Sequence, residues 1–262
     1  MVDDPIFIVF DIAAVVVLAW WMFESLAPTH HFVGQWRWRT ALLSALGLSL
    51  AAIYFVLTTW ASFDVVDSAF YVVGYLSLGL IWISISSRVL SSFADIRLQQ
   101  DVRDRNNLAA AVAIGGLQVG SAVAYAGGNI GDGPGFHVVV FSALLSTLTV
   151  YGAAWVMALV SDGEERISVD HDLGAAIRLA GVAIAAGIVA GRGAAGDWVS
   201  AEATLVDFVV VTWPVVLIVM AGVIMERRSP PSYASNNLVE SSLFAAVALA
   251  LAGAYVSSLG PW

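Results

Sequence analysis

Eight apolar stretches of about 20 residues make up most of this 262-residue chain. A membrane-spanning helix needs that length, because its backbone polar groups must bond to one another inside the lipid. The stretches cover approximately residues 5–24, 40–60, 68–88, 107–126, 136–160, 173–190, 204–225 and 237–257. Apolar residues account for 60% of the sequence, which exceeds the usual share in soluble domains. The sequence therefore predicts an all-α polytopic membrane protein with about eight transmembrane helices.

Arginine is distributed unequally between the two sides of such a bundle. Arg192 lies in a loop on one side, and Arg178 lies inside the sixth stretch. The first, third, fifth and seventh loops hold the others: Arg37, Arg39, Arg88, Arg97, Arg103, Arg105, Arg166, Arg227 and Arg228. Basic residues in short loops remain in the cytoplasm. This pattern predicts a multi-pass protein of the cell membrane with both termini extracellular.

The composition narrows the classes of function. The chain has eleven arginines, no lysine, no cysteine and a net charge of −9. This balance is typical of haloarchaeal proteins, and a bound basic partner is the alternative explanation. The absence of lysine excludes a retinal Schiff base, and the absence of cysteine excludes disulfides and iron–sulfur clusters. Nucleic acid is not an expected partner, because the arginines alternate with acidic residues and form no basic stripe.

Polar residues recur at the starts of helices with a fixed spacing. Asn107, Asp172 and Asn237 are separated by 65 and 65 residues. A period of this length indicates a repeated supersecondary unit, here a helical hairpin. Four hairpins of one orientation would be parallel repeats about an axis along the membrane normal. They would pair into two four-helix units, residues 1–128 and 129–262.

The two helices of each hairpin differ in side-chain size. Even-numbered stretches carry small residues four apart, such as Ala111 with Gly115 and Gly116 with Gly120. Small residues let helix backbones approach closely in lipid. Odd-numbered stretches carry the bulky side chains: Trp20, Trp21, Phe23, Trp82, Trp155 and Trp213. We therefore expect an inner ring of even helices and an outer ring of odd ones, with an irregular bundle as the alternative.

The element at residues 105–120, Arg-Asn-Asn-Leu-Ala-Ala-Ala followed by paired glycines, resembles a bacterial and archaeal membrane family, domain of unknown function 350. Residues 235–262 resemble the family's C-terminal end, and residues 170–185 match in part. Residues 36–51 depart furthest, because Trp38 and Arg39 stand where the polar pair is expected. The resemblance implies two tandem four-helix units in a small membrane protein of the kind often encoded near envelope-stress components. It implies no settled activity.

The repeated polar residues have two interpretations. Asn106 or Asn107, Asp172, and Asn236 or Asn237 stand where a helix leaves an arginine-rich loop. As N-caps, they would satisfy free amides of the first helical turn. Alternatively, they would form a ring of polar helix starts that faces an anion or the acidic groups of a partner.

Two acidic residues lie inside odd-numbered stretches. Asp11 and Asp207 are within about two turns of the extracellular end. Ionisable groups in membrane spans are functional candidates, because burying them costs free energy. One of them would relay protons, or both would form hydrogen bonds to neighbouring helices and water.

The even-numbered stretches contain further polar candidates. Arg178 lies about six residues inside the sixth stretch, so it either extends back to the cytoplasmic surface or pairs with Glu240 or Asp172. Gln118 and several serines are expected to bond between helices, and they would line a pore only if they converge. Trp213-Pro214 predicts a kink in the seventh helix.

No enzyme motif is present. The sequence has no phosphate-binding loop, nucleophile elbow or paired metal-binding histidines, so we expect no catalytic activity, metal or cofactor. The lipid bilayer is one expected partner of the chain, and two functions within it stay open. The favoured one is a membrane component that docks envelope-maintenance or complex partners, cytoplasmic or membrane-bound, through the charged loop Ser91–Arg105. The alternative is a small-solute or ion/proton transporter or channel with a path among the even helices. A homo-oligomer is compatible with either.

Overall fold

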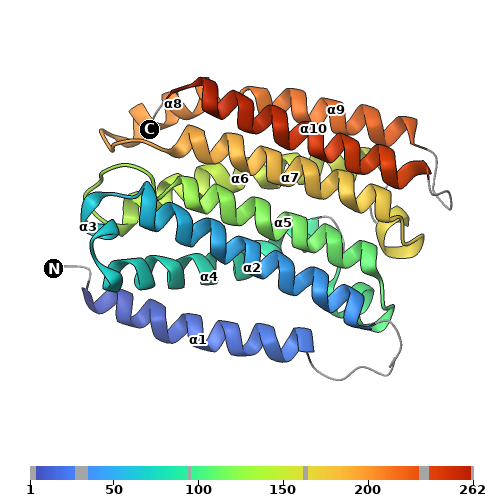
Figure 1. Ribbon diagram of the computed structural model, residues 1–262, viewed down its shortest axis with the longest axis horizontal. Helices are drawn as coiled ribbons and strands as arrows, with labels where there is room; N and C mark the ends of the chain where they lie inside the picture. Colours follow the sequence, from blue (N-terminus) through green and yellow to red (C-terminus); the bar gives the residue numbers. More distant parts are fainter. Residues whose placement is uncertain (1–3, 27–34, 94–95, 162–164, 230–235, 261–262) are drawn as a thin grey trace.

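The computed structural model describes residues 4–26, 35–93, 96–161, 165–229 and 236–260. Long antiparallel helices extend across the molecule in these ranges (Figure 1). The α-helices are α1 (Asp4–Leu26), α2 (Gln35–Thr59), α3 (Phe63–Val66), α4 (Ala69–Phe93), α5 (Leu108–Gly127), α6 (Phe136–Ser161), α7 (Leu173–Ala194), α8 (Ala201–Thr212), α9 (Pro214–Arg228) and α10 (Asn236–Ser258). Two π-helices, η1 (Leu98–Asp104) and η2 (Glu165–Val169), precede α5 and α7.

In these ranges, seven helices are long and apolar enough to cross a membrane: α1, α2, α4, α5, α6, α7 and α10. Helices α8 and α9 meet this criterion together and bend by 41° where they join, so the count reaches eight if the pair is one span. Pro214 begins α9 and has no N–H for the preceding turn, which confirms the expected kink. The all-α, multi-pass class predicted from the apolar stretches agrees with this fold.

The long helices lie in two layers. One row consists of α2, α5, α7 and α10, which contain the even-numbered apolar stretches and are the even helices of the prediction. In this row α5 packs against α2 and α7, and α7 packs against α10. Helices α4, α6 and α9 lie behind this row (Figure 1), and α1 packs against α4. Helices α2 and α10 stand at the two ends of the row, with α5 and α7 between them. The described helices therefore do not form the expected inner ring. The odd helices α4, α6 and α9 thus cover one side of the row and do not enclose its two ends (Figure 1).

Glycine allows an unusually close contact between α5 and α7. A β-carbon on Gly116 would stand 2.2 Å from the β-carbon of Ala180. One on Gly127 would stand 2.3 Å from the Cα of Gly191. The two backbones therefore meet directly, which is how helices gain van der Waals contact in lipid. This seam leaves no space for a path between the two central helices.

Candidate functional site

The starts of α5 and α7 have the same local structure. In both, a π-helix comes first and the residue before the N-cap has a positive φ, 54° at Asn106 and 56° at His171. The N-cap oxygens then accept from backbone amides, Asn107 from Ala110 and Asp172 from Ala175, each at 3.1 Å. The N-cap interpretation is therefore confirmed for Asn107 and Asp172. The sequence does not predict the two π-helices, which are rare in proteins.

Asn107 also joins α5 to η2. Its Nδ2 donates to the carbonyl of Ile167 at 2.6 Å, and the Arg105 guanidinium donates to the carbonyl of Ser168 at 3.2 Å. Arg105 pairs with Asp101 at 2.9 Å in addition. Asn107 is completely buried. The start of α5 is thus attached to the turn that precedes α7.

A buried network of six polar side chains lies at the same end of the bundle. We call it the Arg178 network, and its members are Arg166, Asp172, Arg178, Glu226, Asn237 and Ser241. Arg178 Nε donates to Glu226 Oε2 at 2.5 Å, and Nη2 donates to Oε1 at 3.0 Å. Its Nη1 donates to Asn237 Oδ1 at 2.8 Å and to Ser241 Oγ at 2.5 Å. One arginine therefore connects α7 to both α9 and α10.

Arg166 forms the other half of this network. Its Nη2 pairs with Asp172 Oδ2 at 2.6 Å, and its Nη1 pairs with Glu226 Oε1 at 2.6 Å. Two arginines and two acids give the network a formal charge of zero. Buried ions are tolerated when they are paired and hydrogen-bonded, and each ion here has an opposite partner. The arrangement suits a clamp between helices better than a carrier of ions.

The position of Arg178 corrects two expectations. The side chain is 0% exposed, so it does not extend to the surface. Its carboxylate partner is Glu226, whereas Glu240 is exposed and Asp172 pairs with Arg166. The cause is tertiary, because the end of α9 packs beside α7. No helical spacing relates positions 178 and 226.

The last copy of the repeated polar pair also differs from expectation. Asn237 lies inside α10, which begins at Asn236, and its Oδ1 accepts from Arg178 and Ser241. It is therefore part of the network rather than an N-cap. The side chain of Asn236 lies outside the described residues.

Asp11 and Asp207 do not form a common site. Asp11 is half-buried on α1, and its Oδ1 has no hydrogen-bond partner within the described part of the chain. Asp207 is exposed on α8. Helices α1 and α8 lie at opposite edges of the bundle (Figure 1), so the two carboxylates are far apart.

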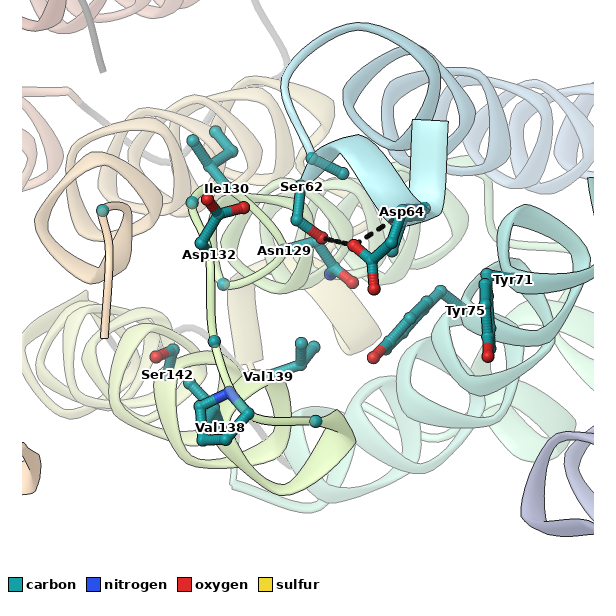
Figure 2. A pocket seen from close by; sticks show the side chains of 18 of the residues that line it. Ser62, Asp64, Tyr71, Tyr75, Asn129, Ile130, Asp132, Val138, Val139 and Ser142 are labelled. Atoms are coloured by element: carbon teal, nitrogen blue, oxygen red, sulfur yellow. Dashed lines mark hydrogen bonds between the residues drawn. The ribbon is translucent and has the colours of Figure 1, made fainter. Parts of the chain in front are cut away.

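A cavity of about 270 Å³ opens at the opposite end of the bundle from the Arg178 network. We call it the α3 pocket, because α3 and the turn before it form one wall. The turn after α5, residues 128–135, forms another wall, and α4 contributes Tyr75. Figure 2 shows Asp64, Asn129 and Tyr75 turned toward the same space. The glycines between positions 127 and 135 predict a turn, but no pattern in the sequence indicates this pocket.

Hydrogen bonds hold one rim of the α3 pocket. The amide of Gly196 donates to the carbonyl of Ile130 at 2.9 Å, and that of Trp198 donates to the carbonyl of Asp132 at 2.8 Å. The amide of Asp132 donates to Asp197 Oδ1 at 2.8 Å. Gly131 has a φ of 101°, and a β-carbon there would stand 2.3 Å from the backbone of Gly196. The turn after α5 is thereby fixed to the turn after α7.

Polar side chains continue into the bundle between α4, α5 and α6. The hydroxyl of Tyr125 donates to the carbonyl of Tyr75 at 2.7 Å, and Trp82 Nε1 donates to Thr147 Oγ1 at 2.9 Å. Ser146 Oγ donates to the carbonyl of Ala124 at 2.9 Å. These bonds connect each pair of the three helices.

Gln118 lies nearer the arginine-rich end. It is 2% exposed, its Nε2 has no hydrogen-bond partner among the described residues, and it lines a second cavity of about 230 Å³. Arg88 lines the same cavity. Its guanidinium lies 4.1 Å from the centre of the Trp20 ring.

Comparison with known proteins identifies a family for this chain. A family model described as Domain of Unknown Function (DUF350) matches residues 40–194, from α2 to the end of α7. The matched stretch extends across residue 128, where the boundary between two tandem units is expected. No curated protein and no solved structure matches. Within the described ranges, no three metal-binding side chains come together.

Proposed function

This chain belongs to the domain of unknown function 350 membrane family, and on that premise we propose that it is a non-enzymatic membrane component that docks a partner protein at its arginine-rich end. The observation that carries the proposal is an ordered, polar and exposed turn at that end. We call residues 96–105, which include η1, the docking segment. Orientation with this end in the cytoplasm follows from the arginine distribution and is part of the proposal.

Three buried residues anchor the docking segment. Ile96 and Val102 are 0% exposed and Asp101 is 4% exposed. Asp101 Oδ2 accepts from the amide of Arg97 at 2.6 Å, and its Oδ1 pairs with Arg105. The segment is therefore held in one conformation, which reduces the entropy lost on binding.

The exposed side of the docking segment is polar and charged. Its exposed members are Arg97, Gln99, Gln100, Asp104 and Arg105. The Arg178 network lies at the same end and holds α7, α9 and α10 together. Its ions are paired, and the α5–α7 seam is closed. Both features favour a rigid support over a conduit among the even helices.

Single cysteines test the docking proposal without background, because the native chain has none. We expect Gln99→Cys and Asp104→Cys to crosslink to the same protein partner in native membranes. The matched control is Val169→Cys, which is 60% exposed in the neighbouring π-helix η2 and should not give that adduct. Absence of a shared adduct from positions 99 and 104 would contradict docking at this segment.

Single cysteines at the two ends of the bundle report the orientation. A membrane-impermeant thiol reagent should label Val199→Cys, 80% exposed at the other end, in intact cells. It should label Gln99→Cys only after the membrane is opened.

One observation favours transport as a second candidate. The polar contacts between α4, α5 and α6 lead from the α3 pocket toward Gln118 and Arg88. A path for ions or small solutes would therefore pass along α4 and α5 into the cavity beside Gln118, which α1, α2 and η1 also line. It would not run through the middle of the row of even helices, as the sequence suggests.

Flux into proteoliposomes tests this second candidate. Transport predicts ion or proton flux above that of empty vesicles, and Gln118→Leu should reduce it at least about tenfold. The substitution removes an amide nitrogen that has no hydrogen-bond partner among the described residues, so it should cost little stability. Asp207→Asn is the control and should leave flux unchanged, because Asp207 is exposed. Absence of flux across a panel of ions would remove the transport candidate and leave docking.

A further inference from the structure

The α3 pocket combines acidic groups with a buried acceptor that lacks a donor. Asp64 and Asp132 line it, and no arginine or histidine is among its lining residues. Asn129 is 6% exposed; its Nδ2 donates to the carbonyl of Tyr125 at 2.8 Å, whereas its Oδ1 has no partner in the described part of the chain. A buried acceptor without a donor is unfavourable, so this site suits a ligand that brings donors and positive charge.

The lining and the size of the pocket suit an organic cation better than a bare metal ion. Ser62 Oγ donates to Asp64 Oδ1 at 2.5 Å, and the amide of Val65 donates to the same oxygen at 3.1 Å. These bonds orient the carboxylate, and Figure 2 shows it turned into the pocket together with Asn129 and Tyr75. Only two carboxylates line the pocket, and its volume of about 270 Å³ exceeds that of a bare metal ion. The volume is close to the lower limit for small-molecule sites.

Apolar side chains form part of the remaining wall. Val65, Val138 and Val139 line the pocket beside the oxygen atoms, and Phe7 lies against the rings of Tyr71 and Tyr75. An alkyl group would contact these side chains while a positive head faces the acceptors. The rim is already fixed by the bonds between the turns after α5 and α7, so little ordering accompanies binding.

We propose that the α3 pocket binds a small protonated alkylamine, whose ammonium group donates to Asp64 and Asn129 and whose alkyl chain lies on the valine wall. The site is independent of docking at the other end of the bundle. A primary ammonium offers three donors, which matches a lining of acceptors. Charge-assisted hydrogen bonds of this kind are stronger than neutral ones.

Calorimetric titration of the full-length protein tests this site, with n-butylammonium chloride as the probe at constant ionic strength. We expect saturable binding to the native protein. Asp64→Asn should weaken it at least about tenfold, because it removes the charge opposite the ammonium group. Asp67→Asn is the matched control: Asp67 is exposed in the same turn and does not line the pocket, so affinity should change less than about twofold.

Three results would overturn the proposal. The first is the absence of saturable n-butylammonium binding to a protein whose thermal unfolding is normal. The second is an equal loss of affinity in Asp64→Asn and Asp67→Asn, which would indicate general attraction to an acidic surface. The third is tight binding of Ca²⁺ that displaces n-butylammonium, which would make the pocket a metal site. Asp132→Asn changes the second carboxylate of the lining and is also expected to weaken binding. It replaces Asp64→Asn as the test if that variant does not fold.

Discussion

Gly116→Ala is expected to destabilise the protein by about 3 kcal/mol or more, although it adds a single methyl group. That methyl group would stand 2.2 Å from the β-carbon of Ala180 and 2.5 Å from its Cα. A backbone cannot move aside as a flexible side chain can, so α5 and α7 must separate. Extra methylenes in well-packed cores commonly cost about 1–3 kcal/mol, and a contact between two backbones lies at the upper end. Thermal unfolding in detergent, followed by the loss of the monodisperse elution peak, measures the effect.

The matched controls are Gly47→Ala and Gly152→Ala. Both glycines lie in long helices, and a β-carbon at either would meet no atom within 4 Å. Alanine is also the better helix former, so these variants should be neutral or slightly more stable. If Gly116→Ala unfolds at the same temperature as the controls, α5 and α7 do not meet backbone to backbone at this glycine.

Glu226→Gln is expected to have the largest effect of any charge substitution at the arginine-rich end. Glu226 is 3% exposed and pairs with both Arg166 and Arg178. Its neutralisation leaves two buried arginines with one buried acid, Asp172. Removing one partner of a buried ion pair typically costs about 3–5 kcal/mol. The free energy of unfolding in a denaturant titration would measure this loss.

A double variant distinguishes the loss of the ion pairs of Glu226 from a non-specific loss of stability. Arg178→Met together with Glu226→Gln restores a neutral network, because Arg166 and Asp172 stay paired. We therefore expect the double variant to be more stable than Glu226→Gln alone by about 0.5–3 kcal/mol, the size of interaction energies between residues in one ionic network. Arg227→Gln, the exposed neighbour, should change stability by less than about 0.5 kcal/mol. Simple additivity of the two single effects would argue against a network.

Local signals in the sequence predicted local features well. Proline has no amide hydrogen, so Pro214 marked the break between α8 and α9. Asn107 and Asp172 marked helix starts, because their short side chains bond to the first turn. The partner of Arg178 was not predictable in this way, since Glu226 is 48 residues away in the chain. The same holds for Asn129 and Asp64, which line one pocket although they lie far apart in the chain.

The amino-acid sequence by itself determined that the chain is a helical membrane protein, that Asn107 and Asp172 begin helices, that Pro214 breaks one, and which helices carry the small residues. These features depend on length, hydropathy and neighbours along the chain. Only the tertiary structure decided that the even helices form an open row, that Arg178 binds Glu226, and that Asp64 and Asn129 face one pocket. The physical reason is that lipid-facing and buried helix faces are both apolar, so the pattern along a helix does not reveal which face meets a neighbour.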